Sequence, residues 1–159
     1  MTDFKGLLRC LSERRVEFII VGGVAATAHG SSQLTVDLDI VYRRTSENIQ
    51  RLVDSLQPQA PYLRGAPPGL PFQWDSETIR HGLNFTLTTK LGDIDLLGEI
   101  VGGGKYEDLA PHSISLNLYG VSHRCLNLEK LIEVKRAAGR PKDLERLAEL
   151  EALLEERKK

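Results

Sequence analysis

The sequence contains only two cysteines, Cys10 and Cys125, which lie far apart and form no C-x-x-C pair. This scarcity argues against a disulfide framework or a cysteine zinc site, and favours free thiols in a reducing compartment. No apolar run approaches the roughly 20 residues that a membrane-spanning helix needs. The first ten residues, MTDFKGLLRC, are interrupted by charges, which is not typical of a signal peptide. We therefore expect a cytoplasmic protein with no membrane partner.

Several catalytic motifs are also missing from the chain. It has no G-x-S-x-G nucleophile elbow, no G-x-x-x-x-G-K-[ST] phosphate loop and no H-E-x-x-H zinc pair. These absences argue against a serine hydrolase, a P-loop NTPase and a zinc protease. The formal net charge is −1, so nothing attracts the whole molecule to nucleic acid, and any basic site has to be local.

The composition is that of an ordinary globular protein, with 41% hydrophobic and 27% charged residues in a chain of 159. We expect one domain over residues 1–159, with a core at about 16–126 and C-terminal helices at about 127–157. Periodicity predicts helices that begin after a Thr2 cap, a Thr45 or Ser46 cap and an Asn127 cap. Alternation or short apolar runs predict strands, and the fold class is α/β (α+β), a mixed sheet flanked by helices. The expected helices cover about 3–14, 24–29, 46–57, 128–138 and 141 onward, and the expected strands 17–21, 35–42, 83–88, 94–97, 114–118 and 121–125.

The segment TVDLDIVY places two aspartates, Asp37 and Asp39, on the same face of a strand, with Cα atoms about 6.5–7 Å apart. Such pairs are common on solvent-exposed strands. A later segment, GDIDLL, repeats the spacing with Asp93 and Asp95. If the two strands are neighbours, the carboxylates converge and need a cation, because like charges at close range repel. Oxygen ligands of this kind suit Mg²⁺.

A glycine pair, Gly22-Gly23, lies between an expected strand and an alanine-rich expected helix. Glycines at such a junction either make a tight turn or allow backbone N–H groups to approach a phosphate. Ser31, Ser32 and Thr35 follow and could add hydroxyl groups. Residues 58–71 contain five prolines and two glycines, which predicts a surface loop or a substrate-contacting lid.

A basic cluster occurs late in the chain, in the segment VKRAAGRPKDL. Lys135 lies near the expected C-terminus of a helix, where a cation is stabilising in any case. The functional interpretation is that this cluster neutralises phosphate charge across a cleft from the carboxylates. Asp143 either begins the last helix or pairs with one of the cations.

On these motifs the chain resembles the nucleotidyltransferase superfamily with the polymerase-β-like fold. It is most similar to the small bacterial branch related to AbiEii-type toxins and minimal nucleotidyltransferases. The resemblance covers about 18–144 and rests on the following matches: Gly22-Gly23, Gly30-Ser31, Thr35, Asp37-Leu38-Asp39, Asp95 and the 135–143 segment KRAAGRPKD.

The resemblance implies that Mg²⁺ or Mn²⁺ assists transfer of a nucleoside monophosphate from an NTP to an acceptor hydroxyl, with release of pyrophosphate. Asp37, Asp39 and Asp95 would be the metal ligands and catalytic residues. The groups that would hold the NTP are Gly22, Gly23, Ser31, Thr35, Lys135, Arg140 and Lys142. The acceptor is open between an RNA end, a protein hydroxyl and a small molecule.

The chain departs from the family pattern at Gln33, where many relatives have an arginine. Together with the small size of the chain, this motivates a second hypothesis, a non-catalytic NTP- or protein-binding member of a toxin–antitoxin pair. A third hypothesis is an unrelated α/β domain whose acidic strands simply face solvent.

Overall fold

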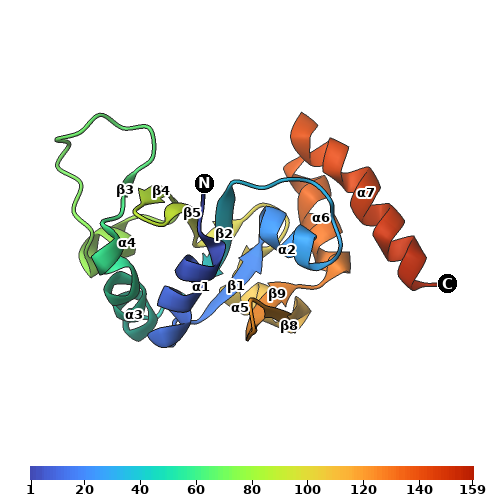
Figure 1. The fold of residues 1–159 in the computed structure, drawn as a ribbon, viewed down its shortest axis with the longest axis horizontal. Helices are drawn as coiled ribbons and strands as arrows, with labels where there is room; N and C mark the ends of the chain where they lie inside the picture. Colours follow the sequence, from blue (N-terminus) through green and yellow to red (C-terminus); the bar gives the residue numbers. More distant parts are fainter.

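The computed structural model describes residues 1–159 and is built around a seven-stranded mixed sheet (Figure 1). The strand order is β3-β4-β5-β2-β1-β9-β8, and a separate two-stranded ribbon pairs β6 with β7. The strands are β1 (Phe18–Val21), β2 (Asp37–Tyr42), β3 (Tyr62–Leu63), β4 (Phe85–Thr89), β5 (Gly92–Leu97), β6 (Glu99–Ile100), β7 (Gly104–Lys105), β8 (Ser113–Leu118) and β9 (Val121–Leu126).

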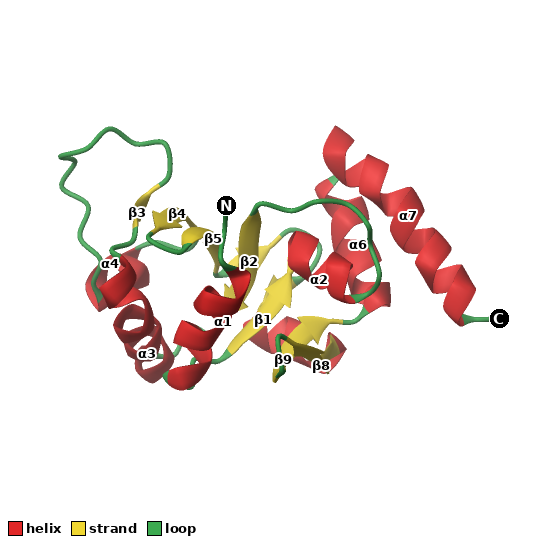
Figure 2. Cartoon of the chain, in the orientation of Figure 1, coloured by secondary structure: helices red, strands yellow, loops and turns green.

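Helices flank the sheet and lie beyond both of its ends. Figure 2 shows α3 and α4 at one end and the pair α6 and α7 at the other, with the C-terminus at the free end of α7. The helices are α1 (Phe4–Glu13), α2 (Gly22–Ala28), α3 (Ser46–Leu56), α4 (Ser76–His81), α5 (Tyr106–Leu109), α6 (Leu128–Ala138) and α7 (Pro141–Arg157). The expected mixed sheet with flanking helices and a C-terminal helical pair is therefore confirmed.

The centre of the sheet combines two kinds of pairing. Strand β2 is antiparallel to β1 and parallel to β5. All four residues of β1 are buried, whereas β2 and β5 alternate, with Leu38, Ile40, Ile94 and Leu96 fully buried. A one-residue slip would turn these side chains out of the core and the aspartates into it, so burial determines the register.

The start of the chain differs from the expectation. Asp3, rather than Thr2, caps α1 by accepting a hydrogen bond from the Gly6 N–H. The Thr2 hydroxyl instead donates to the Val36 carbonyl and accepts from the Asp93 N–H, so it joins the beginnings of β2 and β5. Strand β2 begins at Asp37 and not at residue 35 as expected, and Val36, just before it, is 72% exposed.

Periodicity did not indicate the shortest elements. The two-residue strand β3 lies in the segment that the sequence predicted as a loop, and α4, α5 and the β6–β7 ribbon lie in segments for which it predicted no element. Elements of two to six residues carry too little periodic signal to be identified and depend on tertiary contacts. None of the helices combines the length and the apolar character that crossing a bilayer would require. Both cysteines are free thiols.

Asn48 joins the edge of the core to the N-terminus of α3. Its side-chain oxygen accepts a hydrogen bond from the Glu17 N–H at 2.6 Å, and its amide donates to the Glu17 and Arg43 carbonyls at 2.9 and 2.8 Å. Only 1% of Asn48 is exposed. One buried amide therefore satisfies backbone groups of two partly buried residues, one before β1 and one after β2.

We expect Asn48→Ala to lower the free energy of unfolding by about 2–3 kcal/mol, because it leaves buried backbone groups without partners. Urea denaturation measures the change. Gln50→Ala is the matched control, since Gln50 lies on the same helix and bonds Asp54 at the surface. Equal stability of the two variants would contradict this role of Asn48.

Candidate functional site

Four aspartates face one another across the central parallel pair. Asp37 of β2 pairs with Asp93 of β5, and Asp39 pairs with Asp95. Because alternate residues of a strand share a face, all four lie on the side opposite the buried leucines and isoleucines. Asp37, Asp39 and Asp95 each bring one carboxylate oxygen within 4.8 Å of the others. The structure thus brings together the three acids that the sequence suggested as metal ligands.

Asp39 is the most perturbed of these acids. Burial, followed by repulsion from Asp37 and Asp95, raises the pKa of Asp39 to about 8. Its Oδ1 atom is buried and has no hydrogen-bond partner. Burial and the neighbouring Asp95 also raise the pKa of Asp37. A buried carboxylate with an unpaired oxygen and like charges beside it is stabilised by a cation, so the donor set fits a hard divalent ion.

The two glycines allow α2 to begin directly against this acidic group. Strand β1 ends at Val21, which pairs with Asp39, and α2 starts at the next residue. Gly22 has φ of +67°, and a Cβ there would lie 2.2 Å from Asp39 Oδ2. A Cβ on Gly23 would lie 2.5 Å from Thr35 Oγ1. The expected glycine turn is therefore the first turn of the helix itself, and side chains are excluded from it.

Lys135 and Arg140 of the late basic cluster line the same cavity as Asp39. Asp143 has no exposed surface and accepts hydrogen bonds from Lys135 Nζ at 3.2 Å and Arg140 Nε at 2.6 Å. Burial acts to raise the pKa of Asp143, but the hydrogen bonds from Arg140 and Lys135 outweigh it, and the pKa is lowered. Asp143 lies in the first turn of α7, where it also accepts the Arg140 N–H, and it orients two cations, which combines both interpretations drawn from the sequence.

The cavity has a volume of about 390 Å³. Its polar lining consists of Asp39, Asn84, Glu99, Lys135, Arg140 and Asp143, together with the backbone of Gly22. Apolar side chains form much of the remaining wall: Val21, Leu97, Ile100, Val101, Leu131, Val134 and Ala138. A cavity of this size with apolar walls and few charged groups is typical of a small-molecule site.

Other residues proposed from the sequence have different surroundings. The Ser31 hydroxyl donates to Glu149 Oε1, and the Ser32 hydroxyl and N–H both donate to Glu149 Oε2. Thr35 lies against Gly23 and donates to the Asp37 carbonyl at 3.3 Å. Lys142 is exposed, forms no ion pair and does not line the cavity. Gly22, Thr35, Lys135 and Arg140 therefore lie near the acidic group, whereas Ser31 is held by α7.

Sequence reasoning missed two arginines. Arg64, in the proline-rich segment, forms ion pairs with Asp37, Asp93 and Asp95 at 3.6, 3.4 and 2.8 Å. Arg146 of α7 donates to the Leu34 carbonyl at 3.0 Å, and its Nη1 would lie 3.1 Å from a Cβ on Gly23. Neither arginine belongs to a motif, and both contacts join segments far apart in the chain, so no local signal could have identified them.

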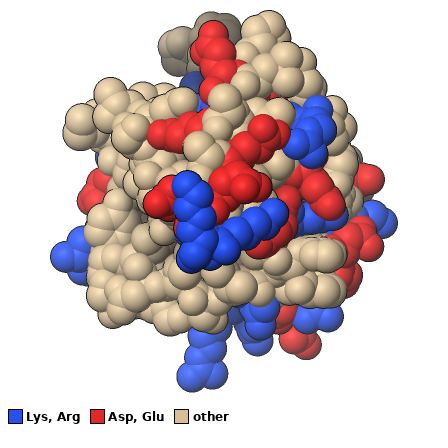
Figure 3. Space-filling model, turned by 90° about the vertical axis from the view of Figure 1, so that its right-hand side faces the viewer, with Lys and Arg blue, Asp and Glu red and all other residues tan.

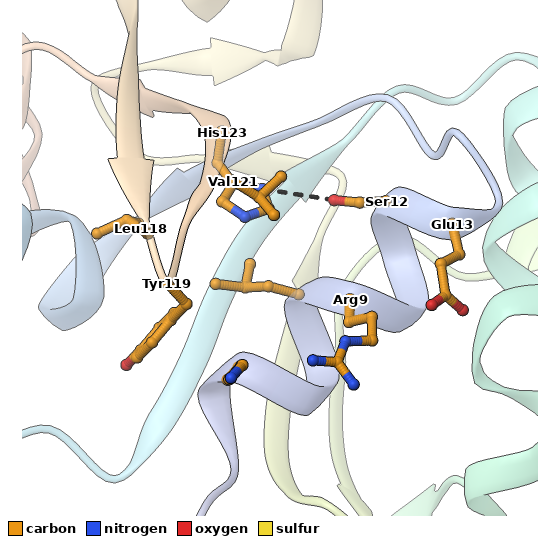
Figure 4. Close-up of a pocket in the computed structure, with 9 residues that line it drawn as sticks. Arg9, Ser12, Glu13, Leu118, Tyr119, Val121 and His123 are labelled. Carbon is orange, nitrogen blue, oxygen red and sulfur yellow. Dashed lines mark hydrogen bonds between the residues drawn. The ribbon is translucent and has the colours of Figure 1, made fainter.

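A second cavity, of about 360 Å³, lies between α1 and the β8–β9 hairpin (Figure 4). It shares no lining residue with the first cavity. Ser12 Oγ lies 3.5 Å from His123 Nδ1, but no carboxylate hydrogen-bonds to this histidine, so the pair is not part of a catalytic triad. On the face that carries α7, acidic and basic side chains are intermingled, in keeping with the near-zero net charge (Figure 3).

The comparisons with known proteins agree with this geometry at the level of fold. No protein-family model matches the chain, and no curated protein matches it by sequence. A crystal structure from Thermotoga maritima, described as that of a "putative nucleotidyltransferase", superposes with a TM-score of 0.59. The fold is nucleotidyltransferase-like. The match covers 94% of each chain at 14% sequence identity, so the similarity is one of architecture.

We expect Asp39→Asn to stabilise the metal-free protein at pH 8.5 by about 1–3 kcal/mol, because the amide removes a buried, unpaired charge. The unfolded carboxyl titrates near pH 4, whereas in the folded protein the pKa of Asp39 is about 8. The folded state therefore binds the proton more tightly, and wild-type stability should fall as the pH rises from about 4 to 8. The variant should lose less stability over that range. Urea unfolding in EDTA at pH 5.5 and 8.5 measures this, and an equal decline in both proteins would refute it.

Gly22→Ala should destabilise the protein by about 1–3 kcal/mol, because a positive φ and a clash with Asp39 coincide. Gly120→Ala is the matched control, since Gly120 has φ of +82° but no atom within 4 Å of an added Cβ. Thermal unfolding of the two variants separates the backbone cost from the clash. If the two lose the same stability, the close approach of Gly22 to Asp39 carries no energetic weight.

Proposed function

We propose that this chain is a divalent-metal-dependent nucleotidyltransferase that moves a nucleoside monophosphate from an NTP to an acceptor hydroxyl. The observation that carries the proposal is the convergence of Asp37, Asp39 and Asp95 beside a helix that begins with two glycines. The fold match supports the same reaction class. The proposal also includes that the chain belongs to the AbiEii-type branch and that it acts in the cytoplasm.

In the proposed reaction, the acceptor oxygen forms a bond to the α-phosphorus while the bond from that phosphorus to the β-phosphate bridging oxygen breaks. Pyrophosphate leaves, and the acceptor proton passes to Asp95 or to water. Asp37, Asp39 and Asp95 would hold Mg²⁺ or Mn²⁺. Such an ion, when bound, neutralises phosphate charge and aligns the attacking and leaving oxygens.

The remaining groups of the chain would bind and orient the NTP. Backbone N–H groups at Gly22 and Gly23 are free of side-chain caps and can donate to phosphate oxygens. Lys135 and Arg140, fixed by Asp143, would neutralise phosphate charge. Arg146 offers a guanidinium beside Gly23 and could supply a cation that Gln33 does not. Ser31, Thr35 and Lys142 remain proposed phosphate contacts.

The acceptor remains open between an RNA end, a protein hydroxyl and a small molecule. A non-catalytic role in a toxin–antitoxin pair, binding NTP or a partner protein, is the second candidate. Two observations favour it. Arg64 lies among the carboxylates, and Ser31 is committed to Glu149. Neither arrangement requires turnover.

The test is transfer of label from an α-³²P-labelled NTP, in Mg²⁺ or Mn²⁺, to total cellular RNA, protein and small metabolites. We expect labelled product with the wild-type chain. Asp37→Ala or Asp39→Ala should reduce it at least about a hundredfold, because the lost metal contacts are worth several kcal/mol in the transition state.

Asp54→Asn, a change of a surface carboxylate on α3, is the control and should leave transfer unchanged. Mass spectrometry of RNA and protein after expression identifies the acceptor from the added nucleotide mass. Transfer that survives both active-site substitutions would overturn the assignment. NTP binding without any transfer would favour the non-catalytic candidate.

A further inference from the structure

The acidic group is occupied by a side chain of the protein itself. The Arg64 guanidinium lies over three of the four aspartates and donates to Asp95 Oδ1 at 2.8 Å and to the Leu87 carbonyl at 2.7 Å. It also forms the longer ion pairs with Asp37 Oδ2 and Asp93 Oδ2. Its side chain is 26% exposed. We propose that Arg64 is a displaceable internal cation, which holds the acidic group when no metal is bound and leaves when a divalent ion enters.

This inference rests on the proposed metal site and adds a mode of regulation to it. Arg64 and a metal would compete for the same atoms, because Asp37 and Asp95 belong both to the converging triad and to the arginine's ion pairs. A guanidinium and a divalent ion repel each other at such distances, particularly where water is partly excluded. Binding of the metal therefore requires Arg64 to leave, and the metal affinity depends on the fraction of molecules in which Arg64 has left the carboxylates.

The arginine satisfies the site incompletely. Its Nε atom is buried without a hydrogen bond, although Asp93 Oδ2 lies 3.4 Å away. No ion pair joins it to Asp39, whose Oδ1 also lacks a partner. One delocalised charge thus pairs with three carboxylates and not with the fourth, and two buried polar atoms stay unpaired. Such atoms have a free-energy cost that a better-matched cation would relieve.

The segment that carries Arg64 is joined to the sheet by few backbone hydrogen bonds. Strand β3, just before it, has two residues, forms the sheet edge and pairs with β4, and the Arg64 N–H donates to the Thr86 carbonyl. Gly65 and Gly69 follow with φ of +78° and +90°, and no atom lies within 4 Å of a Cβ built on either. Residues 67–71 are exposed and arch away from the body of the protein (Figure 1).

The two ends of the arch are anchored. Tyr62 packs edge-on against Phe72 with ring centroids 6.0 Å apart, and its hydroxyl accepts from the Leu70 N–H. Trp74 Nε1 donates to the Val53 carbonyl at 2.9 Å. The stretch between these anchors has few buried contacts, so it opens at a low free-energy cost without unfolding the core.

The first test measures Mn²⁺ binding to the full chain by isothermal titration calorimetry, in the wild type and in Arg64→Gln. We expect the variant to bind about tenfold more tightly, the gain that follows when the competent arrangement rises from about a tenth of molecules to nearly all. Arg80→Gln removes the same charge from an exposed side chain on α4 and should leave affinity unchanged. Equal or weaker Mn²⁺ binding by Arg64→Gln would overturn the proposal while leaving the metal site intact.

The second test uses the wild-type chain and so does not depend on the folding of a variant. Trypsin cleaves after Arg64 only when that side chain is free to enter the protease. We expect millimolar Mn²⁺ to accelerate this cleavage severalfold, with the fragments identified by mass spectrometry, and to leave cleavage after Arg80 unchanged. An unchanged rate at Arg64 under saturating Mn²⁺ means that the arginine stays in place, which refutes displacement. Absence of Mn²⁺ binding in every protein would instead overturn the metal site together with this inference.

Discussion

The structure depends on one constraint: two acidic strands are paired in register, so that four carboxylates share one small face of the sheet. The apolar side chains on the opposite face maintain this pairing. Leu38, Ile40, Ile94 and Leu96 have no exposed surface, and a one-residue slip of β2 against β5 would expose side chains of this kind and bury the acids. Hydrophobic burial thus holds in place a repulsive arrangement that the acids alone would disperse. The price appears at Asp39, where burial raises the pKa to about 8.

The local part of this arrangement could be predicted from sequence. Period-two alternation in TVDLDIVY and GDIDLL indicates strands with acids on one face, and the apolar period of the C-terminal residues indicates two helices. The pairing of β2 with β5 could not be derived this way, because about fifty residues separate the strands and strand order depends on the whole core. The error in the start of β2 has the same origin. The alternation of residues extends back to residue 35, but the Val36 carbonyl accepts a hydrogen bond from Thr2, a contact between segments far apart in the chain.

The candidate site divides in a similar way. Acids, glycines and the late lysine could be recognised because their spacing along the chain is part of their chemistry. Arg64 and Glu149 could not, since each acts through a partner that only the folded chain brings near. Arg64 lies in a segment whose prolines and glycines predict a loop. They do not predict which residue of that loop contacts the aspartates. The sequence predicts that Glu149 lies on a solvent-exposed helix face, yet its carboxylate accepts hydrogen bonds from the hydroxyls of Ser31 and Ser32.

The distribution of charge around the cavity also narrows what fits there. Asp39 and Glu99 bring negative charge to its lining, and Lys135 and Arg140, held by a fully buried Asp143, bring positive charge. A bare anion would be repelled by Asp39 and Glu99, and a bare cation would be repelled by Lys135 and Arg140. A polyanion together with a divalent cation would match both signs of charge, and the apolar lining would accommodate an uncharged ring. The metal-bound nucleotide of the proposed function has these three parts, so the lining is consistent with that proposal.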